Sequence, residues 1–254
     1  MKIHPALVKA FAILAVVALL MMALGQIGQL VDERQARFRE AERSIEQSQA
    51  GRQALLGPVL HSRCVEEWDT SVGEGKDRKT VTDKREFTLM ATPRQLSVQA
   101  TAVTEPRYRG LFKVNAYATQ ASLQAQWAPL TALRAQRDHA GSRISCDAPI
   151  LMVAVSDARG IRHAEVSVAG ESLPVVAGTL HASHPRGFHA VLPEAVRQAD
   201  TALSVNVTME LVGTAALAVA PVADDTRMQL SANWPHPSFG GRFLPITREV
   251  RADG

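Results

Sequence analysis

Residues 10–31 carry no charged side chain, and Lys9 and Asp32 bound this run on its two sides. A helix of about 20 apolar residues is long enough to span the hydrocarbon core of a bilayer. Two glycines and two glutamines weaken the last third of the run. The run therefore predicts a membrane-spanning helix, with residues 1–31 forming a cytoplasmic N-terminus and a single pass, so the lipid bilayer is the first expected partner.

A cleaved signal peptide is the alternative interpretation of the same segment. Lys2 and Lys9 would supply its charged region, residues 12–22 its apolar region, and Ala23-Leu24-Gly25 a cleavage site of small residues. The sequence after residue 31 favours an uncleaved anchor, because a helical pattern continues there without a break.

That pattern consists of apolar residues at three-, four- and seven-residue spacings, which place them on one face of a helix. Charged residues occupy much of the remaining surface. The apolar positions are Ile27, Val31, Phe38, Ala41 and Ile45, and the charged ones are Arg34, Glu40, Glu42, Arg43 and Glu46. We predict an amphipathic stalk helix over residues 32–50.

Beyond residue 50 a two-residue alternation replaces the helical period. It is clearest from Leu96 to Ala102 and from Val205 to Leu211, while polar residues 71–82 predict a hairpin tip. Short helices are expected only at residues 129–139 and 193–199. Many short strands favour an antiparallel β-sandwich over a parallel α/β fold. The fold class is therefore mainly β, with a sandwich-like domain over residues 51–254.

Charge and cysteine content limit the remaining possibilities. The formal net charge is +3 and is spread along the chain, which predicts no nucleic-acid partner. Cys64 and Cys146 lack the close spacing of zinc ligands. In a domain outside the cytoplasm they could form a disulfide, and two free buried thiols are the alternative.

No motif for a cofactor is present, since the chain lacks a phosphate-binding glycine loop, a dinucleotide fingerprint, a serine elbow and a zinc-protease helix. His181, His184 and His189 could offer imidazole ligands, although a polar surface loop explains them more simply. We predict no metal, no cofactor and no catalytic residue.

Two acidic motifs could in principle supply the paired carboxylates of a glycosidase. Asp157-Ala158-Arg159-Gly160 is more simply a turn in which the aspartate caps backbone donors and the glycine supplies a positive φ. Asp224-Asp225 similarly predicts a hairpin tip before Thr226.

The segment from Ser231 to Pro245 contains three prolines, two glycines, a tryptophan, a histidine and two phenylalanines. Each proline fixes φ and biases the preceding residue toward extended geometry, so a stiff, extended loop is expected. Within it, His236 and Ser238 flank Pro237, but a nucleophile also needs a third orienting group. We therefore expect recognition or structural bracing by Trp234, His236, Ser238 and Phe239.

This loop resembles that of the CreD family of bacterial inner-membrane, cell-envelope integrity proteins. Further segments resemble the same family: the Arg107-Tyr108-Arg109-Gly110 strand entry, the Ser156-to-Ile161 turn and the Gly51-to-Val59 strand. Arg107 and Tyr108 are on this basis candidate binding residues. Family members continue into further membrane helices, whereas this chain stops at Gly254, so we expect a truncated form or the anchored part of a longer protein.

The resemblance implies a non-enzymatic role in envelope integrity, within the response to β-lactam stress and colicin tolerance. It also implies a bacterial inner-membrane location with the main domain in the periplasm. The positive-inside rule indicates the opposite orientation, because four arginines follow the apolar run, but they are mixed with acids and belong to a large domain.

A different class of function is a periplasmic domain that binds or hydrolyses cell-wall glycan, with Trp68, Trp127 or Trp234 stacking on a sugar ring. Other envelope proteins are the remaining candidate partners. An interaction module predicts an exposed aromatic patch, whereas a hydrolase predicts two carboxylates in a cleft or Ser238 in contact with His236.

Overall fold

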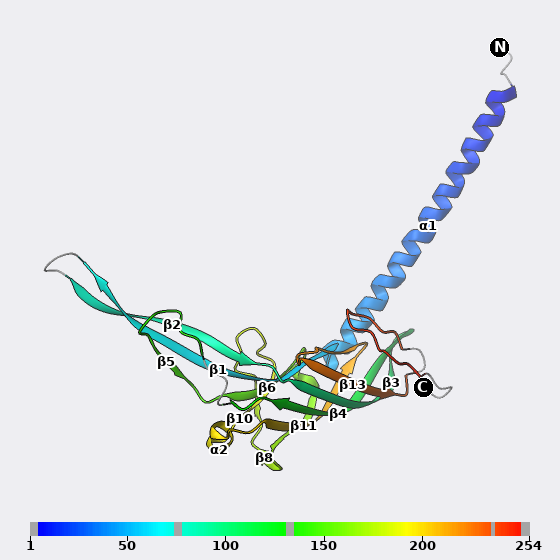
Figure 1. Ribbon diagram of the computed structural model, residues 1–254. Helices are drawn as coiled ribbons and strands as arrows, with labels where there is room; N and C mark the ends of the chain where they lie inside the picture. Colours follow the sequence, from blue (N-terminus) through cyan, green and yellow to red (C-terminus); the bar gives the residue numbers. More distant parts are fainter. Residues whose placement is uncertain (1–4, 74–77, 131–134, 235–236, 250–254) are drawn as a thin grey trace.

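The computed structural model describes residues 5–73, 78–130, 135–234 and 237–249, and in it one long helix projects from a β-sandwich (Figure 1). The helix, α1, runs without interruption from Pro5 to Ser48. Among the described residues it is the one helix that is long and apolar enough to cross a membrane, over Ile13–Ser48, and no side chain in its most apolar window is buried. The predicted membrane helix and stalk thus form one continuous element.

The described strands form two sheets that face each other, so the predicted sandwich-like, mainly β fold is confirmed. The first sheet has the order β12-β1-β6-β10-β9, with β2 and β5 also paired to β1, and the second has the order β13-β3-β4-β11-β7-β8. The strands of the first sheet are β1 Gln53–Val72, β2 Lys79–Ala91, β5 Arg143–Cys146, β6 Ile150–Val155, β9 Val176–Ala177, β10 Gly187–Val191 and β12 Leu217–Val219. Those of the second are β3 Gln95–Arg109, β4 Phe112–Trp127, β7 Ile161–Val168, β8 Glu171–Leu173, β11 Leu203–Thr214 and β13 Asp225–Ala232.

Pairing is antiparallel except at two places. β12 runs parallel to β1, and β13 runs parallel to β3 with Asp225 opposite Gln95. The predicted hairpin tip at Asp224-Asp225 is therefore wrong, because the short connection 220–224 leads from β12 in the first sheet to β13 in the second, and β13 pairs with a strand far away in sequence.

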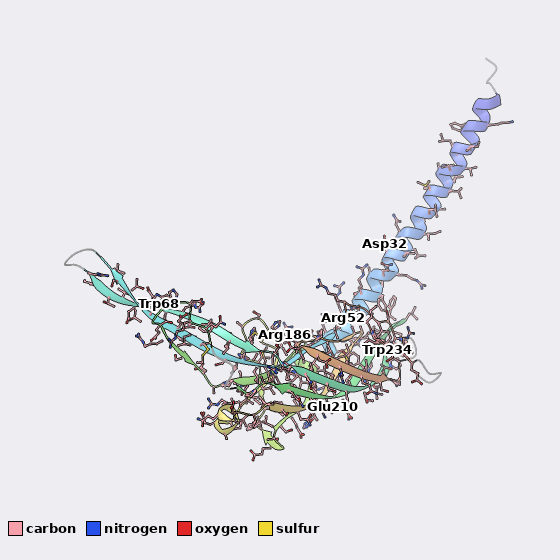
Figure 2. The ribbon with its side chains drawn as sticks, in the orientation of Figure 1. Asp32, Arg52, Trp68, Arg186, Glu210 and Trp234 are labelled. Atoms are coloured by element: carbon pink, nitrogen blue, oxygen red, sulfur yellow. A yellow bond between two sulfur atoms is a disulfide. The ribbon has the colours of Figure 1, made fainter. Side chains whose placement is uncertain are left out.

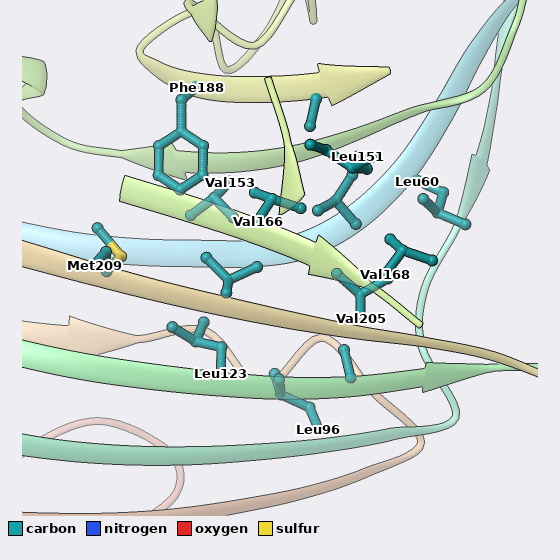
Figure 3. Close-up of a cluster of buried hydrophobic side chains, with 14 of the residues drawn as sticks. Leu60, Leu96, Leu123, Leu151, Val153, Val166, Val168, Phe188, Val205 and Met209 are labelled. Carbon is teal, nitrogen blue, oxygen red and sulfur yellow. The ribbon is translucent and has the colours of Figure 1, made fainter. Parts of the chain in front are cut away.

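The core lies between the two sheets and is built from alternate residues of each strand (Figure 3). Leu60, Leu151 and Phe188 come from the first sheet, and Leu96 and Leu123 from the second. Burial of an aliphatic side chain contributes about 1.5–3 kcal/mol, so this cluster supplies the main driving force for folding. The alternation read from the sequence corresponds to these inward-facing positions.

β1 and β2 extend beyond the sandwich as a long two-stranded arm (Figure 1). The predicted hairpin over residues 71–82 is confirmed, although its tip, residues 74–77, lies outside the described part. β5 pairs antiparallel with β1, and this pairing places Cys146 opposite Cys64. The structure joins these two residues in a disulfide.

Of the two short helices expected from the sequence, the second corresponds to α2, Glu194–Gln198. The first covers residues 131–134, which lie outside the described residues. The flanking residues 135–139 are not helical.

Candidate functional site

The C-terminus of α1 accepts hydrogen bonds from one side chain, that of Arg159, which is distant from it in the sequence. Arg159 donates from Nη1 to the carbonyl oxygen of Gln47 (3.1 Å) and from Nη2 to that of Glu46 (2.9 Å). The last carbonyls of a helix lack partners within the helix, and a positive charge is favourable there. Arg159 thus caps the membrane helix from the side of the sandwich.

Asp157 fixes the position of that arginine. Its Oδ2 lies 2.6 Å from Nη2 of Arg159, and its Oδ1 accepts from Nε at 3.0 Å. The same carboxylate accepts the backbone N–H of Gly51, in the link between α1 and β1, at 3.1 Å. These bonds, led by that from Arg159, lower the pKa of Asp157 to about 2. The carboxylate therefore stays charged and connects the helix end with the turn.

Gln53, the first residue of β1, adds further hydrogen bonds to the contact between α1 and the sandwich. Its side-chain amide donates to the carbonyls of Asp157 (2.9 Å) and Val212 (3.1 Å), and its Oε1 accepts the N–H of Asp157 at 3.2 Å. The residue is 2% exposed. Buried amide groups need such partners, so these bonds fix β1, β11 and the turn relative to one another. We call Gln53, Asp157, Arg159 and Gly160 the junction.

Gly160 is required at the junction by close packing. A Cβ atom there would lie 2.2 Å from Nε2 of Gln53 and 2.3 Å from the carbonyl oxygen of Val212. The predicted turn is confirmed as a short 3₁₀ segment, and Asp157 accepts the N–H of Arg159 within it. The expectation of a positive φ at Gly160 is wrong, since the glycine is needed for space rather than for backbone conformation.

The stalk also packs on the sandwich along its apolar face. Ala41 and Ile45 are buried, and the rings of Phe38 and Phe112 meet edge to face with centroids 6.2 Å apart. Ile27 and Val31, which belong to the same predicted stripe, are exposed. Among the described residues, the buried apolar positions of the stalk thus lie in the last two turns of α1, with Phe38 about one turn before them.

Three of the candidate binding residues, Arg107, Tyr108 and Trp234, lie at the end of the sandwich near α1. Figure 2 shows Trp234 at this end, close to the lower part of the helix. Just before it, Oδ1 of Asn233 accepts hydrogen bonds from the backbone and side chain of Thr104 on β3, so the loop continues alongside that strand. Arg107 and Tyr108 follow on the same strand and are exposed.

The other predicted residues of this loop are not gathered into a site. His236 lies outside the described residues, so its relation to Ser238 stays a prediction. Ser238 is exposed, and Phe239 is 43% exposed with the guanidinium of Arg248 5.5 Å from its ring centroid. Phe239 therefore does not brace the loop by burial in the core.

The histidines form a cluster that includes His61. His181 lies 5.5 Å, ring to ring, from both His61 and His184. His61 and His189 instead bond the backbone carbonyls of Thr179 and Gly178. Within the described ranges no three acidic, histidine or cysteine residues are placed to hold a metal ion. His189 lies buried in β10 rather than on a surface loop.

A second charged cluster, on the arm, was missed by the sequence interpretation. Glu66 is fully buried on β1, and its Oε2 lies 2.9 Å from Nη2 of Arg85 on β2. Its Oε1 accepts from the hydroxyl of Ser142 and the backbone N–H groups of Asp138 and His139, at 2.6, 2.9 and 3.0 Å. The bond from Ser142, together with these amides and Arg85, lowers the pKa of Glu66 to about 2.

The signal for this cluster is visible in the sequence. Glu66 alternates with Cys64 and Trp68 on one face of the strand, and a charged residue at a buried position of this kind requires partners. We call Glu66, Arg85 and Ser142 the arm cluster.

Of the tryptophans proposed to stack on a sugar, Trp127 is buried and Trp68 already makes a stacking contact. Trp127 is 3% exposed and donates to the carbonyl of Ala91. The Trp68 ring stacks on the imidazole of His139, with centroids 3.6 Å apart and planes 7° from parallel. The prediction that Trp127 stacks on glycan is therefore wrong, and one face of Trp68 is already covered.

Comparison with known proteins places the chain among inner membrane proteins. The family model described as "Inner membrane protein CreD" matches residues 5–254. The chain is 31% identical over 249 residues to Inner membrane protein CreD of Escherichia coli strain K12, and the alignment covers 97% of this chain and 53% of that protein. The chain thus spans about half the length of this curated relative.

Proposed function

Because this chain belongs to the CreD family of inner membrane proteins, we propose that it is a non-enzymatic anchor whose β-sandwich supports cell-envelope integrity from the periplasm. Residues 1–31 would form the cytoplasmic end and membrane helix, 32–50 the stalk and 51–254 the periplasmic domain. The setting would be the response to β-lactam stress and tolerance of colicins.

The observation that carries this proposal is the junction. Arg159 and Asp157 tie the sandwich to the last turn of α1, and the buried residues of the stalk add apolar contact. A domain joined to its membrane helix by several directed bonds moves with that helix rather than on a loose tether. Such a connection suits a protein that transmits position or force between the membrane and the structures next to it.

The disulfide supports the periplasmic orientation, because disulfides persist in oxidising compartments. The arginines after the apolar run are weaker evidence than the disulfide, and they would indicate the opposite orientation, with the domain in the cytoplasm. Arg37 pairs with Glu40 at 3.5 Å, and Arg39 and Arg43 bond carbonyls of their own helix. An alkaline phosphatase fused after Gly254 should be active in cells, whereas a fluorescent cytoplasmic reporter at that position would contradict the orientation.

A non-enzymatic role is supported by the use of the strongly acidic carboxylates. Asp157 and Glu66, whose pKa values are lowered to about 2, are both engaged by arginines and backbone donors. A general acid needs a pKa near the working pH, which is the opposite shift. These groups serve connections within the fold.

The test is complementation of a bacterium that lacks its own family member. The full chain should restore survival in a β-lactam and exclusion of a large dye, and Arg159→Ala should lose this activity at equal protein level. Arg162→Ala, an exposed arginine three residues along, is the matched control. Failure of the unaltered chain to restore either property, or full activity of Arg159→Ala, would contradict the proposal.

Binding of cell-wall glycan is a second candidate, favoured by the outer face of the second sheet. Two shallow grooves of about 520 and 560 Å³ cross this face. Amide and hydroxyl side chains line most of them, including Gln99, Ser122, Gln124 and Asn206. Such groups match the hydroxyl and N-acetyl groups of a glycan. Co-sedimentation with purified cell-wall sacculi should fall for Gln99→Ala with Gln124→Ala, and equal sedimentation would exclude this face.

A further inference from the structure

The turn between β3 and β4 presents apolar and cationic side chains to solvent. Arg109 pairs with Phe112, so Gly110 and Leu111 form a two-residue loop, and Gly110 has φ +59° as such a loop requires. Leu111 is 98% exposed and Tyr108 is 64% exposed. Leu111 and Tyr108 thus form an exposed apolar pair at the tip of the hairpin, and a covering surface would bury both of them.

The position of the turn relative to the membrane helix identifies that surface. Phe112 packs against Phe38 of α1, six residues after Asp32, where the uncharged run has ended. At 1.5 Å per residue, Phe38 lies about 9 Å along the helix from Asp32. The headgroup layer on each side of a bilayer is about 5–8 Å thick.

Leu111 extends one residue beyond Phe112, and a strand rises about 3.4 Å per residue. Figure 1 shows β3 and β4 ending at the part of the sandwich from which α1 rises, so the turn lies on the membrane side of the domain. The turn therefore reaches the level of the lipid headgroups when α1 crosses the bilayer.

The charges around the turn match that environment. Arg107, Arg109 and Lys113 are all exposed, and the one acid in the sequence from 104 to 114, Glu105, pairs with Arg107 at 3.0 Å. Tyrosine is enriched at membrane interfaces, and long cationic side chains place their charged ends among headgroups while their stems lie on apolar surface. The net charge of this turn is complementary to phosphate.

We propose that the β3–β4 turn docks on the headgroup layer of the membrane crossed by α1, with Leu111 and Tyr108 inserted and the cations bound to anionic phospholipid. The sandwich then has two attachments to the membrane region, the junction and this turn. Two attachments restrict the tilt of the domain relative to the membrane surface, which a single helix would leave free.

The test uses the full chain in vesicles that contain phosphatidylglycerol in phosphatidylcholine. A nitroxide is attached to Leu111→Cys, and the native cysteines are protected by their disulfide. Val72→Cys, at the far end of the arm and 56% exposed, is the matched control. Collisions with a water-soluble nickel chelate should be rarer at position 111 than at position 72, and collisions with oxygen more frequent.

Charge dependence then identifies the lipid. Since each cation near an anionic surface contributes about fivefold to binding, Lys113→Gln should lower the ratio of docked to free label by about fivefold. Lys79→Gln, on the arm, should have no effect. Circular dichroism and an intact disulfide confirm that each variant is folded.

Equal nickel accessibility at positions 111 and 72 would overturn the proposal. So would protection that persists unchanged in pure phosphatidylcholine and in Lys113→Gln, because a protein contact rather than anionic lipid would then cover the turn. Protection that requires phosphatidylglycerol and is weakened by Lys113→Gln would support it.

Discussion

The arm cluster and the junction use the same chemistry near opposite ends of β1. In each, a carboxylate faces an arginine and accepts backbone N–H groups, and in each its pKa is lowered to about 2. Glu66 has no exposed surface, and its partners come from β2 and the loop before β5. Asp157 is partly exposed, and its arginine is 58% exposed.

The difference lies in what each cluster connects. The arm cluster lies next to the Cys64–Cys146 bridge, and it connects neighbouring segments of a single sheet. The junction connects two separate elements, α1 and the sandwich, and water can reach two of its side chains, Asp157 and Arg159, whereas Gln53 is buried. A buried and covalently reinforced cluster resists change, whereas an accessible one can respond to conditions. The junction is therefore the attachment that a change of solvent conditions, such as pH, can weaken.

Removing the disulfide should produce the largest change and should affect the arm alone. The two cysteines are 82 residues apart, and a loop of this length corresponds to about 4–5 kcal/mol of unfolding free energy on the chain-entropy estimate. We expect Cys64→Ala with Cys146→Ala to lower the urea midpoint, measured by circular dichroism in detergent. A nitroxide on the stalk should keep its mobility, and increased mobility there would show that the two regions are coupled.

Gly160→Ala tests the junction by steric means. The new methyl group would overlap the amide of Gln53 and the carbonyl of Val212, and such overpacking costs about 1–3 kcal/mol. Gly240→Ala is the control, because a Cβ there meets nothing within 4 Å and the residue has no positive φ. Urea unfolding of both variants should separate them, and equal midpoints would mean that the junction relaxes without loss.

The sequence predicts those features that depend on local pattern. The charge-free run predicts the long apolar helix α1, and the alternation of Leu96, Val98 and Ala100 gives inward-facing strand positions. The turn at Asp157 is likewise recognisable from four consecutive residues. Each of these predictions requires only the period of a helix or strand, or the preferences of turn residues.

The remaining features depend on contacts between distant residues. Arg159 meets Glu46 across 113 positions, and nothing near either residue indicates the other. The parallel pairing of β13 with β3 also depends on register across the whole domain. The strand alternation places Glu66 on the same face as Cys64, but its partner Ser142 is 76 positions away, so no local pattern identifies that partner.

Acid should weaken the junction over a defined range. The pKa of Asp157 is lowered when folded, so its contribution to stability is complete above its ordinary value of 3.8 and is lost as the pH falls to about 2. Because Arg159 is solvent-exposed and screened, we expect a contribution of only about 1 kcal/mol.

The measurement is the urea midpoint between pH 5 and pH 2, compared with Asp157→Asn. The variant should be less stable at pH 5 and should show a shallower decline toward pH 2, since Glu66 still titrates in both proteins. Parallel curves for the two proteins would mean that Asp157 has the same pKa folded and unfolded.

The smallest expected effect is at the aromatic contact above the junction. Phe38→Leu removes the edge-to-face contact with Phe112 but keeps an apolar side chain, at a cost of about 0.5 kcal/mol. Phe243→Leu, at a ring that is 77% exposed, should cost nothing measurable.

The consequence for position should exceed that for stability, because this contact sets the height of the β3–β4 turn on the stalk. A nitroxide at position 111 should therefore become more mobile in Phe38→Leu while the urea midpoint hardly moves. If the mobility is unchanged, the junction alone fixes the turn, and the accessible cluster is more rigid than its exposure implies.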